Sequence, residues 1–177
     1  GYSPSRERLN DREAGTVYDE SSALDALEAL QYDMNIGNVR EEYQCVDRQT
    51  VGNRDYYTMQ QYWQGVPVLG YSLVMDVDGS GQVESVDGAY YEIEEFDPSA
   101  SLDEYDARDA VEYYLERTAG MEEGTYELDS GGKVIAVLND EPKAVYQFFL
   151  ADAYGGEPYR SLLVDGNTGD VLADNNW

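Results

Sequence analysis

The stretch that decides the fold is YTMQQYWQGVPVLGYSLVMDV, residues 57–77. In its first half, neighbouring residues alternate between two faces, as they do in a β-strand. Its second half has four hydrophobic residues at a period of two: Tyr71, Leu73, Met75 and Val77. Gly65 and Gly70 stand where the backbone needs positive φ or a close approach, and Pro67 belongs at a sheet edge or a bulge because it has no N–H to donate. The stretch therefore predicts a β-hairpin.

The sequence QQYWQGVPVLGYSLVMDVDGSGQV, residues 60–83, resembles the signature of the fungalysin/thermolysin propeptide (FTP) domain. In that family a strand with paired glutamines runs into an aromatic residue, a bend and a G-(V/I)-P-V-(F/W/L)-G core. The matching residues are Gln60, Gln61, Tyr62, Gly65, Val66, Pro67, Val68, Leu69 and Gly70. Further on, YRSLLVDGNTGDVL, residues 159–172, is similar to the closing hairpin of a PepSY domain, the usual neighbour of an FTP domain.

This resemblance implies a secreted protein that does no catalysis of its own. Its implied partner is a thermolysin-like metallopeptidase, on which it acts as inhibitor and folding chaperone. In such propeptides the C-terminal segment lies in the active-site cleft of the peptidase. The corresponding residues by position are Asp174, Asn175, Asn176 and Trp177, which we expect to form the partner contact.

The chain as a whole predicts an α+β fold with two helix-on-antiparallel-sheet units. Residues 1–20 form an extended polar tail without periodicity, 21–98 an FTP-like unit and 99–177 a PepSY-like unit. Each unit begins with an amphipathic helix, with capping boxes expected at Ser22 and Ser101. Val39–Val46 is expected to be a strand.

The composition excludes several classes of partner. Lys and Arg number 11 against 37 Asp and Glu, which gives a formal net charge of −26. Such a charge repels nucleic acids and anionic membranes. Acid-rich, lysine-poor composition also suggests a protein adapted to high salt, where screening relieves self-repulsion; an ordinary acidic secreted domain is the alternative.

The residue inventory predicts that the chain is not an enzyme and needs no cofactor. There is no histidine, so Ser-His-Asp and Cys-His catalysis and His-bearing zinc sites are excluded. Cys45 is the only cysteine, so it forms no internal disulfide, and we expect it to be a small buried hydrophobe; a disulfide between two molecules is the alternative. A hydrolase based on two carboxylates stays open, because acidic residues are abundant.

A metal site is expected to be absent, although residues 76–87 nearly fit a calcium loop. Asp76, Asp78, Ser80 and Asp87 occupy the positions of ligands in an EF-hand. An EF-hand needs helices on both sides, however, whereas the preceding residues have the pattern of a strand. A hairpin tip with Gly79-Ser80-Gly81 accounts for the same residues through turn chemistry.

A second functional hypothesis belongs to another class. Open sheet edges and an extended tail can join copies of one chain by strand addition, which would make a self-assembling extracellular subunit for a filament or surface layer. The 17 tyrosines suit half-exposed sheet faces and also contact surfaces.

Overall fold

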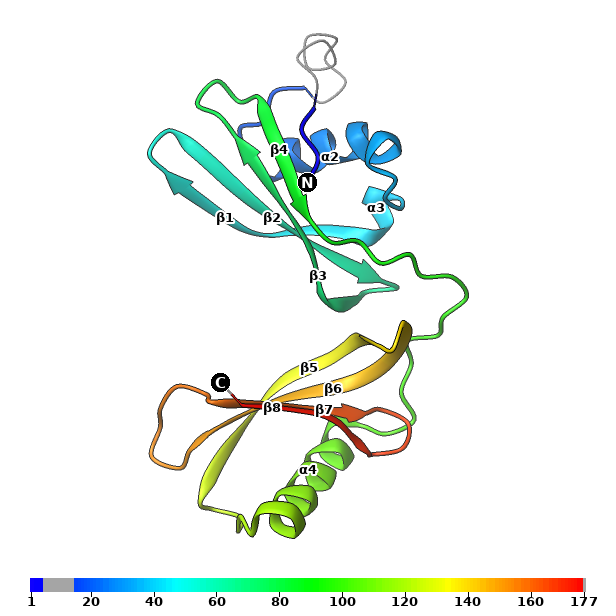
Figure 1. The fold of residues 1–177 in the computed structure, drawn as a ribbon, viewed down its shortest axis with the longest axis vertical. Coiled ribbons are helices and arrows are strands. Elements are labelled where there is room, and N and C mark those ends of the chain that lie inside the picture. Colours follow the sequence, from blue (N-terminus) through cyan, green and yellow to red (C-terminus); the bar gives the residue numbers. More distant parts are fainter. Residues whose placement is uncertain (5–14, 177) are drawn as a thin grey trace. The chain divides into compact units, whose positions relative to one another are not determined.

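The computed structural model describes residues 1–4 and 15–176, and its chain divides into two compact units, residues 1–95 and 96–177. Each unit has an α-helix packed on one face of an antiparallel sheet, so the predicted α+β class is confirmed (Figure 1). The division falls just before the boundary expected after residue 98. Within the described residues, no helix has the length and apolar character that crossing a membrane requires.

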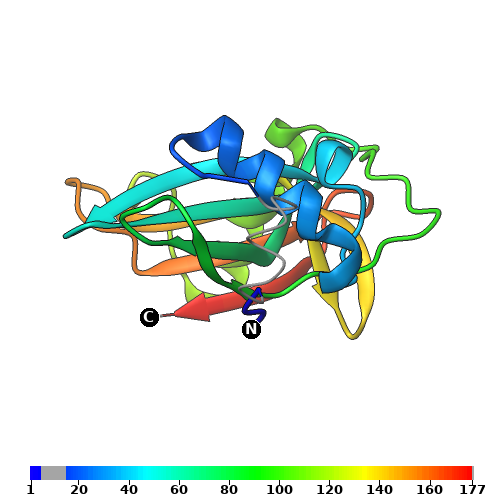
Figure 2. The same cartoon turned by 90° about the horizontal axis from the view of Figure 1, so that it is seen from above.

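The first unit contains two helices and four strands. The helices are α2 (Glu20–Met34) and α3 (Val39–Glu42), and the strands are β1 (Tyr43–Val51), β2 (Arg54–Trp63), β3 (Val66–Val77) and β4 (Val83–Gly88). Consecutive strands pair antiparallel in the order β1-β2-β3-β4. Both helices lie on one face of this sheet (Figures 1 and 2). The core between them buries Leu27 and Leu30 of α2 against Tyr57, Met59 and Met75 of the strands.

The two helices begin where local capping is satisfied, which corrects two expectations. Asp19 caps α2: its carboxylate accepts from the Ser22 N–H at 2.8 Å, and the Ser22 side chain caps in return, so Ser22 is the third helical residue instead of the cap. The strand expected over Val39–Val46 is wrong for its first half. There the side chain of Asn38 accepts from the Arg40 N–H and starts the one-turn helix α3, and the strand begins only at Tyr43.

The hairpin predicted at residues 57–77 is confirmed as β2 and β3. Its two-residue turn has φ of 47° at Gln64 and 82° at Gly65, the pattern of a type I′ turn that matches the twist of paired strands. Between the Gln60–Ser72 and Tyr62–Pro67 pairs, β3 carries four residues opposite a single one of β2. This bulge lies beside Pro67, as expected, and contains Gly70 with a φ of 83°.

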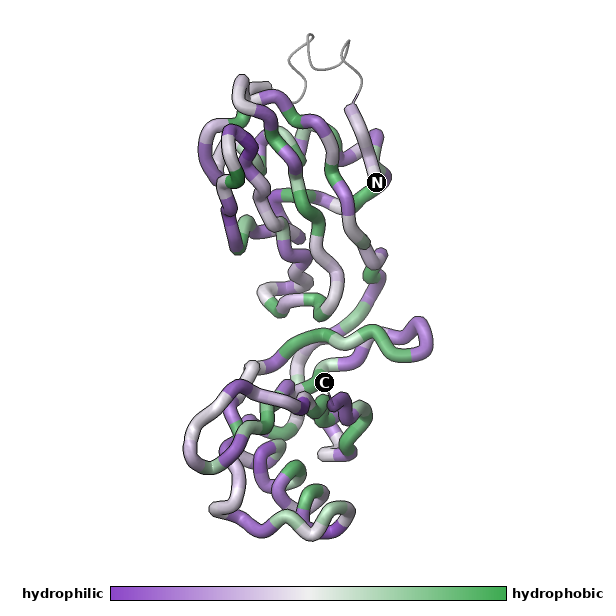
Figure 3. The backbone as a smooth tube through the Cα atoms, turned by 60° about the vertical axis from the view of Figure 1, so that its left-hand side comes forward, coloured by the Kyte–Doolittle hydropathy of each residue, from purple (hydrophilic) through white to green (hydrophobic). Residues whose placement is uncertain are grey.

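The second unit has one helix and four strands. They are α4 (Glu104–Ala119), β5 (Tyr126–Leu138), β6 (Glu141–Asp152), β7 (Arg160–Asp165) and β8 (Val171–Asn176), and the strands pair antiparallel in chain order. Hydrophobic and hydrophilic residues alternate around α4 (Figure 3). Its apolar stripe packs on the sheet; the residues buried in this core include Val111, Leu115, Phe148, Leu150, Leu162 and Val164.

The start of α4 also differs from the expectation. Asp103 is the cap and forms the reciprocal pair with Asp106. Ser101, expected to begin a capping box, instead donates its N–H to the Asn167 side chain at 3.0 Å. In both units an aspartate close to the expected serine takes the cap, because its carboxylate accepts the helical N–H groups.

Candidate functional site

The motif glutamines are the centre of the first unit, and each binds main chain. Gln60 lies at the bulge of β3, where the register shift leaves carbonyls without ladder partners. Its Nε2 lies 2.7 Å from the Val68 oxygen, 2.9 Å from the Gln61 oxygen and 3.1 Å from the Tyr71 oxygen. An amide NH₂ carries two hydrogens, so these three acceptors share them. Gln60 therefore closes the bulge around Gly70.

Gln61 is fully buried and binds a segment that follows the sheet. Its Nε2 donates to the Tyr91 carbonyl at 2.7 Å, and its Oε1 accepts from the Tyr91 N–H at 3.0 Å. The side-chain amide thus replaces the partner residue that a neighbouring strand would supply. Through this pair, β2 holds residues 89–93 next to the hairpin, and the Tyr91 ring lies 5.5 Å from that of Tyr71.

A buried carboxylate lies beside these glutamines. Glu42, the last residue of α3, exposes only 8% of its surface, and burial raises the pKa of its carboxyl. Hydrogen bonds from the Asn38 backbone, the Tyr90 hydroxyl and the Gln61 side chain partly offset this increase in pKa. Burial, followed by the charge of Glu42, raises the pKa of Tyr90 to about 12. Among the described residues, no partner satisfies Oε1 of Glu42.

Gly37 covers this carboxylate. A Cβ at position 37 would lie 1.8 Å from Oε2 of Glu42 and 2.4 Å from the Tyr90 hydroxyl, so a larger residue would force these side chains to shift. The Gly37 backbone therefore packs closely against the carboxylate.

The other motif residues shape the hairpin. Val66 and Val68 are buried, Tyr62 pairs with Pro67 across the strands, and Gly65 forms the turn. The structure thus brings the predicted motif residues together around one bulge. It also adds Glu42, Tyr90 and Tyr91, which sequence reasoning missed because no spacing rule links them to the glutamines.

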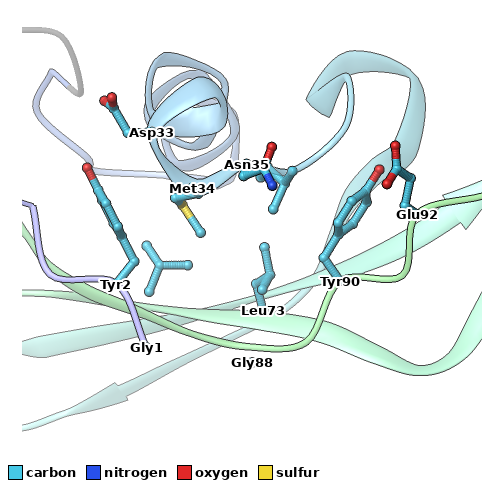
Figure 4. Close-up of a pocket in the computed structure, with 11 residues that line it drawn as sticks. Gly1, Tyr2, Asp33, Met34, Asn35, Leu73, Gly88, Tyr90 and Glu92 are labelled. Atoms are coloured by element: carbon cyan, nitrogen blue, oxygen red, sulfur yellow. The ribbon is translucent and has the colours of Figure 1, made fainter.

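A pocket of about 510 Å³ lies next to this cluster, between the end of α2 and strands β3 and β4 (Figure 4). Tyr2 and Tyr90 stand on opposite sides of it, with Met34 and Leu73 between them. Because Gln61 holds Tyr91, it also fixes the adjacent Tyr90 and with it one wall of the pocket.

The residues of the near-match to a calcium loop have local partners. Asp76 forms an ion pair with Arg54 at 2.9 Å. Oδ1 of Asp78 accepts from the N–H groups of Ser80 and Gln82 and from the Ser80 hydroxyl, and these bonds lower the pKa of the Asp78 carboxyl. Asp87 is exposed on β4. Across residues 1–4 and 15–176, no group of three or more acidic or cysteine side chains is arranged to hold a metal ion. The absence of a calcium site in this hairpin stays a prediction.

The residues expected to contact a partner lie at the end of the second unit. Asp174, Asn175 and Asn176 belong to β8, and Trp177 lies outside the described residues. Asp174 accepts two hydrogen bonds from Arg160, at 2.7 and 2.5 Å, and one from the Tyr114 hydroxyl at 2.7 Å. The Arg160 pair holds the pKa of this carboxyl below its usual range. Asp174 therefore holds β8 to β7 and α4, whereas Asn175 and Asn176 are exposed.

Cys45 lies half-buried in β1, next to the bulge at Val46. Burial raises the pKa of its thiol, which favours the neutral, unreactive form. The structure thus offers no nucleophilic thiolate at this position.

Comparison with known proteins identifies the same region. Residues 41–90 match the model of the Fungalysin/Thermolysin Propeptide Motif, so the FTP motif predicted from the glutamines and the GVPVLG core is present. The match begins beside Glu42 and ends at Tyr90, so it encloses the glutamines together with the carboxylate. No curated protein matches the chain.

One solved structure that resembles the chain is the Bacillus megaterium YpeB C-terminal domain. The sequence identity is 13% and the TM-score 0.45, and the alignment covers 91% of this chain and 66% of that one. The chain therefore spans just under two thirds of that structure. The second unit has the helix and antiparallel strands expected of a PepSY-like domain.

Proposed function

We propose that this chain is a non-catalytic, secreted binding protein with a propeptide-like role, which inhibits a thermolysin-like metallopeptidase and assists its folding through protein–protein contact. The observation that carries this proposal is the FTP motif at residues 41–90. In the structure the polar side chains of this motif, Gln60 and Gln61, bind backbone groups of their own unit. The motif therefore builds a scaffold, and the activity belongs to surfaces that the scaffold presents.

The buried carboxylate supports this interpretation over the hydrolase alternative. A raised carboxyl pKa in a cleft is typical of a general acid. Glu42 instead lies against Gly37, hydrogen-bonded to Tyr90 and Gln61, and exposes only 8% of its surface. Its environment fits a structural role within the hairpin core.

The contact with the peptidase is proposed at the C-terminal end of the second unit. Asn175 and Asn176 are exposed on β8, and β8 is the last strand in the order of its sheet. Since Asp174 is held by Arg160, the contact is proposed at the exposed side chains of Asn175 and Asn176, together with Trp177, which lies outside the described residues. An extended segment of this kind suits a peptidase, because peptidases bind their ligands as extended chains.

A refolding experiment tests the proposal. A denatured thermolysin-like peptidase from the same source is diluted into buffer with or without the chain, and the recovered activity is measured after the chain is removed. The chain should raise the yield, and deletion of residues 175–177 should remove most of the benefit. The matched control is Tyr154→Ala together with Glu157→Ala in the loop between β6 and β7, where both residues are exposed, and this variant should retain it. A yield that does not change with the intact chain would contradict the proposal.

A further inference from the structure

The first residues of the chain form an extra strand segment on β4. The Tyr2 N–H donates to the Val86 carbonyl at 2.7 Å, and the Val86 N–H donates to the Tyr2 carbonyl at 2.6 Å. These two bonds make an antiparallel bridge along the outer edge of β4. The start of the stretch expected to be an extended polar tail therefore pairs with its own unit.

Tyr2 also places a side chain in the pocket described above. Its ring is half-buried and packs against the first core, near Met34 and across the pocket from Tyr90 (Figure 4). The pocket keeps a volume of about 510 Å³ with Tyr2 in place. Backbone pairing along a sheet edge, combined with a pocket for alternate side chains, is the way in which sheet edges bind extended peptides.

The chain that connects this segment to α2 is long. After Tyr2 the chain returns to the same unit at Val17, whose N–H donates to the Gly81 carbonyl at 2.8 Å. Residues 3–16 join these two points. A connection of this length can span at most roughly 50 Å. That reach extends well past its own β4 edge, so the connection does not restrict the segment to its own unit.

We propose that the outer edge of β4 is a strand-receiving site whose ligand is the Gly1–Pro4 segment of a second copy of this chain. The pairing within one chain is the closed form of the same interaction. An identical segment forms the same two backbone bonds with Val86 and places the same ring in the pocket, so exchange between copies conserves every contact. This inference goes beyond the peptidase-directed role and does not depend on it.

Concentration and salt decide between the two forms. Within one chain the segment acts at an effective concentration on the order of millimolar, so the closed form prevails in dilute solution. Each copy carries a formal charge of −26, so the copies repel one another at low salt and approach once the charges are screened. We therefore expect the Gly1–Pro4 segment to pair with a second copy at high protein concentration and high salt.

Two complementary variants remove the closed form. Val86→Pro deletes the N–H that binds Tyr2, and because this N–H points away from β3, the pairing of β3 and β4 stays intact. That variant keeps a segment to donate but has a defective receiving edge. Deletion of residues 1–4 does the opposite, since it leaves an intact edge without its segment. Each variant alone should sediment as a monomer.

An equimolar mixture of the two should form a 1:1 dimer in about 2 M NaCl, where exposed charges are screened, as measured by sedimentation velocity. Its apparent Kd should be at least tenfold tighter than that of self-association of the intact chain, because neither partner has a closed competitor. Met34→Trp, which fills the pocket, should serve as a second edge-defective variant. Val86→Ala is the matched control. It loses side-chain packing as Val86→Pro does but keeps the N–H, so its segment stays closed and its mixture with the deletion variant should dimerise at least tenfold more weakly.

A mixture that stays monomeric up to about 1 mM, the range of the effective concentration within one chain, would overturn the proposal. A synthetic peptide of residues 1–8 tests whether the β4 edge binds an extended segment even when two copies of the chain do not associate. If this peptide binds the deletion variant while no two copies associate, the edge receives extended segments but a second copy is not its ligand, and the proposal is again overturned. Circular dichroism of each variant verifies that its sheet is intact.

Discussion

The side-chain amide of Gln61 hydrogen-bonds to both the N–H and the carbonyl of Tyr91, thirty residues further along the chain. This pair joins strand β2, inside the region that matches the propeptide motif, to the residue that follows the last matched one. It also fixes Tyr90, which contacts the buried carboxylate of Glu42 and lines the pocket. One glutamine thus connects the hairpin, the carboxylate and the pocket wall.

Replacing Gln61 should therefore destabilise the first unit. Gln61→Ala leaves the N–H and carbonyl of Tyr91 without their partner and should lower the free energy of unfolding by about 1–3 kcal/mol. Gln61→Glu should cost more, because a carboxylate cannot donate to the Tyr91 carbonyl. Urea unfolding measures the loss, and hydrogen exchange at the Tyr91 amide locates it. Gln44→Ala, on the exposed face of β1, is the matched control and should change stability by less than about 0.5 kcal/mol. Equal effects of Gln61→Ala and Gln44→Ala would show that the pair contributes nothing.

The bulge in β3 predicts that replacing Gly70 lowers stability through backbone strain alone, without a side-chain clash. Gly70 has a φ of 83°, and a Cβ there would meet no atom within 4 Å. Gly70→Ala should therefore lower the unfolding free energy by about 1–2 kcal/mol through left-handed strain. Gly156→Ala has equal space but no positive φ, so it should be neutral or slightly stabilising. Thermal unfolding of both variants compares them, and the same melting temperature for the two would refute the assignment of strain to Gly70.

The raised pKa of Glu42 predicts a specific dependence of stability on pH. The folded protein binds the Glu42 proton more tightly than the unfolded chain does, whose carboxyl has a pKa of 4.5. Relative to Glu42→Gln, wild-type stability should therefore be highest below pH 4.5, fall as pH rises through the elevated folded pKa, and stay constant above it.

Urea unfolding of both proteins from pH 4 to pH 8 measures this difference. Carboxyls such as Asp78 and Asp174 have lowered pKa values and act in the opposite sense, but they are present in both proteins and cancel in the comparison. A difference in stability that does not change with pH would mean that Glu42 does not titrate differently in the folded state.

The charge of −26 predicts salt-dependent stability. The melting temperature should rise from low salt into the molar range, because counterions screen repulsion among the acidic side chains. If the chain is adapted to high salt, the rise should continue beyond the concentration at which simple screening saturates. A melting temperature that is flat between 0.1 M and about 2 M NaCl would contradict this prediction.

The sequence predicted the hairpin well and the helix starts poorly, for physical reasons. Alternation in residues 57–77 and the two glycines leave few other ways to pair the strands, so β2, β3 and the bulge follow from local pattern. At residues 19–22, both an aspartate and a serine are suitable N-cap residues for the helix, and only the folded geometry shows that Asp19 is the cap. The helical turn at Val39–Glu42 depends on Asn38 and on Gln31, whose side chain accepts from the Val39 N–H, and strand-like composition conceals this turn.

The candidate site was predictable only in part. The motif glutamines stood out by their spacing, yet their partners are backbone groups, which no residue pattern encodes. The Gln61–Tyr91 pair and the Tyr2–Val86 bridge both join segments far apart in the sequence, so they follow from the folded sheet alone. The near-match to a calcium loop shows the opposite case, in which acidic residues with ligand-like spacing have partners within the hairpin.

Inhibition of a peptidase is the decisive measurement for the proposed role. The catalytic domain of a thermolysin-like peptidase from the same source is titrated with the intact chain at high salt, and hydrolysis of a short peptide substrate is followed. We predict stoichiometric loss of activity, with inhibition weakened at least tenfold by deletion of residues 175–177 and unchanged by Tyr154→Ala with Glu157→Ala. Full activity at a large excess of the chain, together with no complex in sedimentation, would contradict a peptidase-directed function.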